Sequence, residues 1–202
     1  AATPEAAVAK LGAEVLKIEP PGGELLRHVS PMRGEFSTVF AALNSGKRSL
    51  KLDLKHAAAA ELCKRLVKNY DVVVENFSPG VMQRLGLDYA TLSALNPRLV
   101  YCSISGFGQT GDWAGRSAYA PVLHAGSGYD LANLDYQDGI ARPLKNGIFI
   151  ADVLGGSLAF GAIQSALLRA ARTGQGDQVD LSLMDAMLGM LVYECQEAQF
   201  PA

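Results

Sequence analysis

The chain has 202 residues, of which 49% are hydrophobic and 19% charged, with a formal net charge of −2. This composition is typical of a folded globular domain, and the balanced charge argues against the broad basic surface that nucleic-acid binding needs. The three cysteines, Cys63, Cys102 and Cys195, lie far apart and form no CxxC pair, which indicates thiols in a reducing compartment and no metal site. We therefore expect a cytoplasmic protein without a bound metal or nucleic acid.

The first half of the chain alternates predicted helices and strands. The segment "GKRSLKLDLK" has leucines at every second position, which is typical of a half-buried strand, and "DVVVEN" is a continuous apolar run, typical of an inner parallel strand. In chain order we expect a helix over residues 4–11, a strand over Glu14–Glu19, a strand over 46–55, a helix over 56–70 and a strand over 71–76.

The second half continues the same alternation. We expect two short helices over residues 81–97, an inner strand over 98–108, a short helix over 119–132, a long helix over Phe149–Arg172, a strand over Gln178–Ser182 and a final helix. Repeated strand–helix–strand units predict an α/β fold with a mostly parallel sheet. No composition change divides the chain, so residues 1–202 are predicted to form one domain. Ligands of such sheets bind at the carboxyl ends of the strands.

One carboxylate has an unusual setting. Asp152 is the only charged residue in the 23 residues from Asn146 to Leu168. Burying an unpaired carboxylate costs several kcal/mol, so Asp152 either caps the helix or has a chemical role as a nucleophile or general base. The run is long enough to cross a bilayer, but it contains several glycines and polar residues. We predict a core helix, and no membrane association.

Two segments could contact a phosphate-bearing ligand. In "ENFSPGVMQR", Asn76 could hydrogen-bond a ligand, Phe77 could pack on it and Arg84 could contact a phosphate. The two cations of "GKRS", at residues 46–49, could do the same. The simpler interpretation of each is a turn or loop with solvated surface cations. No GxGxxG pattern follows the first predicted strand, and the nucleotide-binding pattern GxxxxGK[ST] and the hydrolase elbow GxSxG are absent from the sequence.

These segments together resemble a known family. The ordered stretches "NSGKRSLKLDLK", "VVVENFSPGVMQRLGLDYATLSALNPRLVYCSISGFGQTG" and "RTGQGDQVDLSLMDAML" are similar to those of the family III CoA-transferases, the group that includes formyl-CoA and carnitine CoA-transferases. The resemblance implies a Rossmann-like large domain and a homodimer of interlocked chains. Family members are about twice as long, so we expect a fragment that lacks an N-terminal strand and a second domain.

The resemblance also implies a function. Members of the family transfer CoA from an acyl-CoA to a small carboxylic acid, and Asp152 matches the aspartate that carries CoA as a covalent aspartyl thioester. The residues that match CoA contacts in the family are Leu52, Asn76, Phe77, Arg84 and Arg116. Pro20 stands where the formyl-CoA enzymes have an arginine beside the adenine, so that contact is not expected here.

Two alternatives to transfer stay open at this point. The family has a racemase branch that uses a His–Asp pair before the long helix, but the matching positions here are Ala118 and Tyr119, with His124 a few residues later. This difference favours the transferase. The other alternative is a CoA-binding fragment without catalytic activity, because the segments expected on either side of this chain are absent from it.

Overall fold

The computed structural model describes residues 4–143 and 147–200. Asn146, where the apolar run of Asp152 begins, lies outside the described residues. The helices are α1 (Pro4–Lys10), α2 (Thr38–Asn44), α3 (Ala57–Leu66), α4 (Val81–Arg84), α5 (Tyr89–Ser93), α6 (Ala120–Ser127), α7 (Tyr129–Leu134), α8 (Ile150–Thr173), α9 (Leu183–Met190) and α10 (Val192–Gln199). The strands are β1 (Val15–Glu19), β2 (Met32–Arg33), β3 (Phe36–Ser37), β4 (Lys47–Lys51), β5 (Val72–Glu75), β6 (Val100–Ser105) and β7 (Asp177–Ser182).

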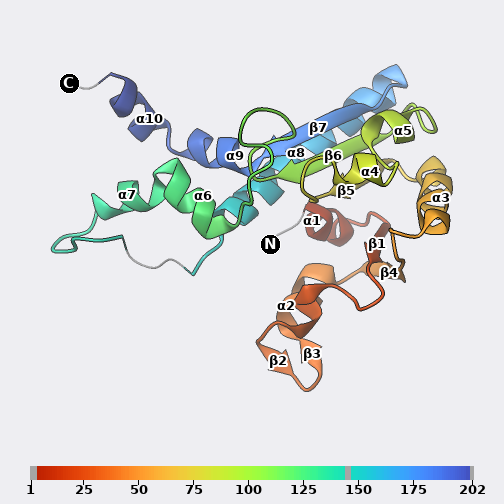
Figure 1. Ribbon diagram of the computed structural model, residues 1–202, viewed down its shortest axis with the longest axis horizontal. Helices are drawn as coiled ribbons and strands as arrows, with labels where there is room; N and C mark the ends of the chain where they lie inside the picture. The colour runs from red at the N-terminus through yellow and green to blue at the C-terminus, as the bar shows by residue number, and fades with distance from the viewer. Residues whose placement is uncertain (1–3, 144–146, 201–202) are drawn as a thin grey trace.

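The strands form two separate parallel sheets (Figure 1). One has the order β5-β6-β7, and the other pairs β1 with β4, all parallel. A short antiparallel hairpin, β2-β3, lies beyond β1. The predicted α/β class with parallel strands is confirmed. The expectation of a single sheet is not met among the described residues, because no strand pairs β1 with β5.

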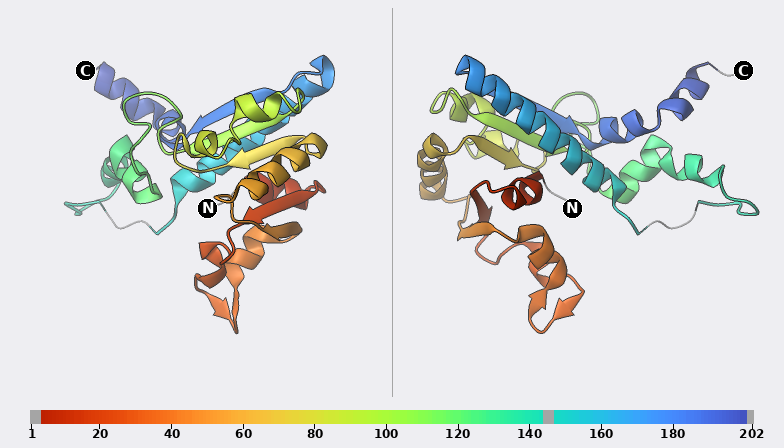
Figure 2. Two further views of the ribbon diagram at one scale, coloured as in Figure 1. Left: turned by 45° about the vertical axis from the view of Figure 1, so that its right-hand side comes forward. Right: turned by 180° about the vertical axis from the view of Figure 1, so that it is seen from behind.

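Helices cover both faces of the three-stranded sheet (Figure 2). On one face, Leu99 and Tyr101 of the β6 segment pack against residues of α3 and α5, and the Tyr101 hydroxyl donates to the Leu87 carbonyl at 3.1 Å. On the other face, Val100 and Cys102 pack against α8. Side chains alternate across a strand, so the apolar residues from Leu99 to Cys102 supply both core layers.

The α8 helix follows the sequence prediction closely, but only one of its sides is buried. Its inner side packs on the sheet through Ala159 and Ile163, while Val153, Leu158 and Leu168 are about half exposed on the outer side. Among the described residues, α8 is the one helix whose length and composition would permit it to cross a membrane. Its packing on the parallel sheet is that of a crossover helix between β6 and β7.

A buried ion pair holds the segment after β1. The Glu19 side chain is fully buried and accepts hydrogen bonds from Arg27 Nε and Nη2, both at 2.7 Å, and from Ser49 Oγ at 2.7 Å. The Arg27 guanidinium also lies over the Phe40 ring, 4.0 Å from its centroid. These contacts fix the loop, the β2-β3 hairpin and α2 at the carboxyl end of β1.

Candidate active site

The first turn of α8 lies where α6 and α9 meet. Ala151 is fully buried there, in a cluster with Leu123 of α6 and Met187 of α9. The Ala151 N–H donates to Nε2 of His124, a side chain only 2% exposed, at 3.3 Å. Helix N-termini leave their first N–H groups without intrahelical partners, so His124 satisfies one of them. This bond fixes the backbone directly before Asp152.

Asp152 is the third residue of α8 and is partly buried. The N-cap residue is Phe149, so the interpretation of Asp152 as the cap of this helix is wrong. A carboxylate in the first turn of a helix interacts favourably with the helix dipole. An ionised, partly accessible carboxylate can act as a nucleophile or base.

The small residues after Asp152 allow a close helix contact. A Cβ on Gly155 would lie 2.1 Å from Leu183 Cδ2, so a larger residue would push α9 or the Leu183 side chain away. A glycine at such a position lets a backbone or a ligand approach the helix closely. The structure shows that the group that approaches is the start of α9.

The carboxyl end of β5 carries a second carboxyl group. Glu75 is 9% exposed, and its Oε2 accepts the Phe77 N–H at 2.8 Å. Burial raises the pKa of Glu75, and the charge of Asp180 raises it further, while hydrogen bonds from Ser103 and from Phe77 oppose the shift. Glu75, Ser103 and Gln109 also line a hollow of about 300 Å³ at the ends of β5 and β6.

The predicted ligand contacts after β5 lie on one short segment. Asn76 and Phe77 are exposed, and both line the edge of a cavity of about 820 Å³. Arg84 is exposed at the end of α4, and its guanidinium lies over Gly80, 3.1 Å from where a Cβ would be. The fold of this turn therefore brings the Arg84 cation back toward the loop that holds Asn76 and Phe77.

The loop after β6 is anchored to β7 and carries Arg116. The Gln109 N–H donates to Asp180 Oδ2 at 3.1 Å. Trp113 packs edge-on against Phe107, with ring centroids 5.5 Å apart, and the exposed Arg116 guanidinium lies 4.4 Å from the Trp113 ring centroid. Arg116 is thus held at the carboxyl edge of the sheet with its N–H groups accessible.

The predicted site residues do not share one cavity. Leu52 is half-buried against the core cluster under α3, and its N–H donates to the Glu19 carbonyl at 2.8 Å. Of the predicted residues, Asn76 and Phe77 line the large cavity, whereas Leu52, Arg84, Arg116 and Asp152 are not among its lining residues. In the described part of the chain, no group of three or more His, Cys, Asp or Glu side chains is placed to hold a metal ion.

Sequence reasoning missed two residues of this region. In the sequence, His124 stands out only as a histidine near the racemase positions, and Glu75 only as one residue of the strand predicted over 71–76. A histidine within a short apolar helix is a signal of burial, but its partner, a backbone N–H, has no side-chain signature. Glu75 could have been noticed because it follows three valines directly.

Comparison with known proteins decides the family. The model of CoA-transferase family III matches residues 2–201. The chain belongs to CoA-transferase family III. It is 39% identical over 192 residues to the succinate–glutarate CoA-transferase of Agrobacterium fabrum, covering 91% of this chain and 47% of that protein. It is 42% identical over 182 residues to the acetyl-CoA:oxalate CoA-transferase of Acetobacter aceti, covering 90% and 46%.

A solved structure supports the same family. The crystal structure of a CAIB/BAIF family protein from Brucella suis matches with a TM-score of 0.88 and 38% sequence identity, covering 98% of this chain and 53% of that one. This family III chain therefore spans about half the length of the proteins it matches. The expectation that the sequence is a fragment of a longer protein is confirmed.

Proposed function

We propose that the full-length protein transfers CoA from an acyl-CoA to a free carboxylic acid, with Asp152 as the covalent carrier. The observation that carries the proposal is the position of Asp152, a partly buried carboxylate in the first turn of α8 of a family III chain. The same carboxyl edge of the sheet carries the loop with Asn76 and Phe77, and ligands of α/β sheets bind at this edge.

The first half-reaction loads Asp152. A carboxylate oxygen of Asp152 attacks the thioester carbonyl of the acyl-CoA, the C–S bond breaks, and a mixed anhydride and CoA thiolate result. The thiolate then attacks the aspartyl carbonyl, which breaks the anhydride C–O bond. The products are an aspartyl-CoA thioester and the first free carboxylate. The α8 dipole stabilises the attacking carboxylate before the reaction.

The second half-reaction restores Asp152. The acceptor carboxylate attacks the aspartyl thioester carbonyl and releases CoA thiolate, which leaves a new mixed anhydride. Attack of the thiolate on the acceptor's acyl carbonyl gives the new acyl-CoA and a free Asp152 carboxylate. One Asp152 oxygen leaves with the first acid and is replaced by an oxygen of the acceptor, so the composition of the protein is restored at the end of the cycle. Water must be kept out, because it would hydrolyse the anhydride and the thioester.

The remaining predicted residues bind CoA in this proposal. Asn76 donates or accepts a hydrogen bond, Phe77 packs on an apolar or ring surface, and Arg84 and Arg116 contact phosphates. Leu52 stands near the adenine by family resemblance, although its side chain packs on the core cluster under α3. The relatives are named for succinate, glutarate and oxalate, so small dicarboxylates are the first acceptors to test. We also propose a cytoplasmic homodimer that binds neither nucleic acid nor membranes.

His124 does not support the racemase alternative. A proton-transfer base needs a free ring nitrogen near the substrate. Nε2 of His124 accepts the Ala151 N–H, and the side chain is only 2% exposed. Ala118 and Tyr119 lie where the racemase branch has its pair, and Tyr119 is the exposed N-cap residue of α6.

Hydroxylamine trapping tests the proposal. The full-length protein is incubated with succinyl-, glutaryl-, formyl- or acetyl-CoA, quenched with hydroxylamine and analysed by peptide mass spectrometry. We expect a hydroxamate on Asp152, and its loss in Asp152→Asn. Asp185→Asn is the matched control, because Asp185 is also the third residue of its helix but is exposed. Binding of CoA without any hydroxamate would contradict covalent transfer. Deuterium exchange at the acyl α-carbon would then favour the racemase.

A further inference from the structure

Three polar residues form a row across the three-stranded sheet. Glu75 of β5 pairs with Ser103 of β6, and Ser103 pairs with Asp180 of β7, both in parallel register. Side chains alternate along a strand, so this polar row lies on the same face as Val73 and Tyr101, which belong to the core under α3 and α5. The face therefore changes from apolar to polar at the carboxyl ends of the strands, where ligands of α/β sheets bind.

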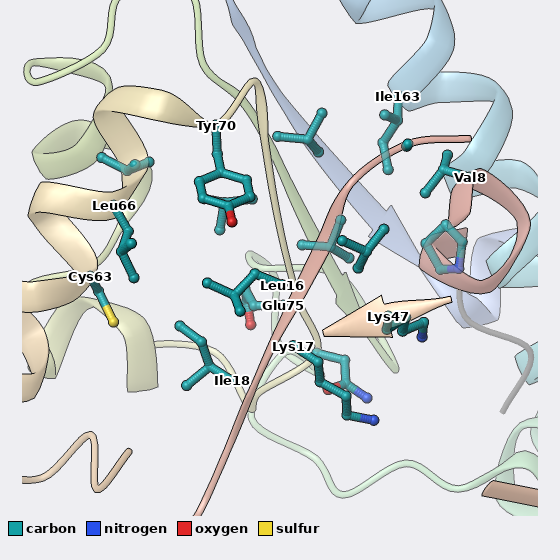
Figure 3. A pocket seen from close by; sticks show the side chains of 18 of the residues that line it. Val8, Leu16, Lys17, Ile18, Lys47, Cys63, Leu66, Tyr70, Glu75 and Ile163 are labelled. Atoms are coloured by element: carbon teal, nitrogen blue, oxygen red, sulfur yellow. The ribbon is translucent and has the colours of Figure 1, made fainter. Parts of the chain in front are cut away.

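Glu75 anchors the turn after β5. Its Oε2 accepts the Phe77 N–H at 2.8 Å, and Ser103 donates a second hydrogen bond to the carboxyl group. Glu75 is 9% exposed and Ser103 only 2%. Figure 3 shows Glu75 among the side chains around the larger cavity, and Glu75 also lines the smaller hollow. The path of the chain through Asn76 and Phe77 therefore depends on this carboxyl group.

Stability alone does not explain a carboxyl group at this position. Glu75 follows three valines in β5, and burial raises its pKa, because the surroundings disfavour the charged form. The negative charge of Asp180 raises the pKa further. Apolar side chains of similar size often stabilise a buried position as well as a polar group does, or better. A carboxyl group that weakens the core but holds the Phe77 N–H points to a role in positioning the turn.

Asp180 anchors the loop after β6. Its Oδ2 accepts the Gln109 N–H at 3.1 Å, and its two carboxylate oxygens lie 3.8 and 4.0 Å from where a Cβ on Gly108 would be. Gly108 has a φ of +81°, a conformation that glycine adopts without strain. The loop therefore turns tightly over the Asp180 side chain.

The loop that Asp180 holds is closed at its base. A Cβ on Gly106 would lie 2.0 Å from the Ala118 Cβ, so the two ends of the loop are in contact. Within the loop, the Arg116 guanidinium lies over the Trp113 ring. Loops whose ends are close and whose side chains pack on one another are compact units. The hydrogen bond to Asp180 therefore also sets the position of Arg116.

The two anchors lie on one sheet, with β6 alone between them. We propose that Glu75 and Asp180 are positioning residues for CoA. Together they fix the distance between the Asn76–Phe77 turn and the loop that carries Arg116, so that one CoA molecule contacts both. The inference rests on the proposed function, which assigns these two segments to CoA. It does not depend on covalent chemistry at Asp152, and neither carboxyl group has to touch CoA.

Calorimetric titration of the full-length protein with CoA tests the role of Glu75. Glu75→Leu removes the acceptor and keeps a side chain of similar size. We expect it to bind CoA roughly fivefold more weakly or worse, with a melting temperature changed by no more than about 3 °C. Glu75→Gln keeps an acceptor for the Phe77 N–H and should bind within about twofold of wild type. If Glu75→Leu melts much lower and its folded form binds CoA as wild type does, Glu75 is only structural and the proposal is wrong.

Asp180 provides variants outside the core, because its side chain is exposed. Asp180→Ala and Asp180→Asn remove the same charge, but only asparagine keeps an acceptor for the Gln109 N–H. We expect Asp180→Ala to weaken CoA binding roughly fivefold relative to Asp180→Asn. Glu75→Leu combined with Asp180→Ala should weaken binding by less than the product of the two single effects, because either loss already frees one loop. Fully multiplicative effects would contradict a single fixed spacing.

Two serines of β6 provide a matched control. Ser103 and Ser105 lie on the same face and are 2% and 8% exposed, but Ser105 Oγ has no hydrogen-bond partner among the described residues. We expect Ser103→Ala to weaken CoA binding by roughly threefold and Ser105→Ala by less than about 1.5-fold. Equal effects would contradict the role of the polar row.

The same titrations separate this inference from the proposed function. If the wild-type full-length protein binds no CoA, the proposed function is wrong, and the positioning role is wrong with it. If wild-type protein binds CoA and forms the Asp152 hydroxamate, while Glu75→Leu, Asp180→Ala and Ser103→Ala bind CoA equally well, only the positioning role is wrong.

Discussion

The imidazole of His124 accepts a hydrogen bond from the backbone N–H of Ala151, the residue before the proposed nucleophile. Nε2 of His124 offers a lone pair to this N–H. The bond joins α6 to the start of α8 in a buried cluster of apolar side chains. His124 is therefore a positioning residue for the first turn that carries Asp152.

Loss of this acceptor should loosen the start of α8. We expect His124→Leu to destabilise the protein by about 1–3 kcal/mol, because the buried Ala151 N–H is left without a partner. His124→Gln keeps a neutral acceptor oxygen and should lose less than half as much. Thermal unfolding measures the stabilities, and amide exchange of Ala151 should accelerate in His124→Leu.

A second histidine provides the control. Nδ1 of the exposed His56 accepts the Ala58 N–H at 3.2 Å and caps α3. His56→Ala should cost only about 1 kcal/mol or less and should leave Ala151 exchange unchanged. If His124→Leu and His124→Gln are equally unstable, packing of the ring and not the hydrogen bond accounts for the role of His124.

The sequence predicted the helices and strands of the core because their signals are local. The valines before Glu75 predicted β5, and the apolar run around Asp152 predicted α8 to within one residue at each end. The β2-β3 hairpin and α2 were not predicted. These short elements are held by the Glu19–Arg27 pair and by the Arg27–Phe40 contact, which join residues distant in the sequence and leave no periodic pattern.

The arrangement of the candidate site was less predictable. The resemblance identified Asp152, Asn76 and Arg84 as individual positions. Their arrangement in space depends on tertiary packing, which the sequence does not show. The sequences of β1 and β5 do not predict that these two strands are unpaired with each other. Each has the composition of an inner strand, whether or not a neighbouring strand is present. The backbone partner of His124 is equally invisible in the sequence.

The Glu19–Arg27 pair makes stability depend on acid pH. The hydrogen bonds from Arg27 hold the pKa of Glu19 down at about 2, against a usual value of 4.5. A lowered pKa stabilises the folded state above the unfolded pKa, and this contribution is lost as the pH falls from about 5 toward 2. We expect a loss of at most about 3 kcal/mol over this range, measured by urea unfolding at successive pH values.

Two substitutions distinguish the contribution of the Glu19–Arg27 pair to stability at acid pH from that of other carboxylates. Glu19→Gln should cost about 1–3 kcal/mol at pH 7 and should flatten the pH dependence between 5 and 2. The exposed Glu14–Arg48 pair, with an N–O distance of 2.6 Å, is the control. Glu14→Gln should change stability by no more than about 1 kcal/mol. An unchanged acid profile in Glu19→Gln would show that other groups determine it.

Two glycines should respond to alanine in opposite directions. A Cβ on Gly176 would lie 1.9 Å from the Leu99 carbonyl oxygen, a backbone atom that cannot move alone, whereas a Cβ on Gly161 in α8 meets nothing within 4 Å. We expect Gly176→Ala to destabilise by more than about 2 kcal/mol and Gly161→Ala to stabilise by up to about 1 kcal/mol. Thermal unfolding of both variants checks this. A stable Gly176→Ala would mean that the turn before β7 is farther from β6.

The Arg84 side chain should contribute to CoA binding through its charge. Its guanidinium lies over Gly80, at the end of the loop that carries Asn76 and Phe77. Charge-assisted contacts to phosphate contribute about 1.5–3 kcal/mol, so we expect Arg84→Ala to weaken CoA binding by the full-length protein roughly tenfold or more. Titration calorimetry at low and high salt measures this, and the difference between variant and wild type should shrink as salt rises. Arg65→Ala removes an exposed arginine from α3 and serves as the charge control. If both substitutions weaken binding equally, only the overall charge matters, and Arg84 has no direct contact with CoA.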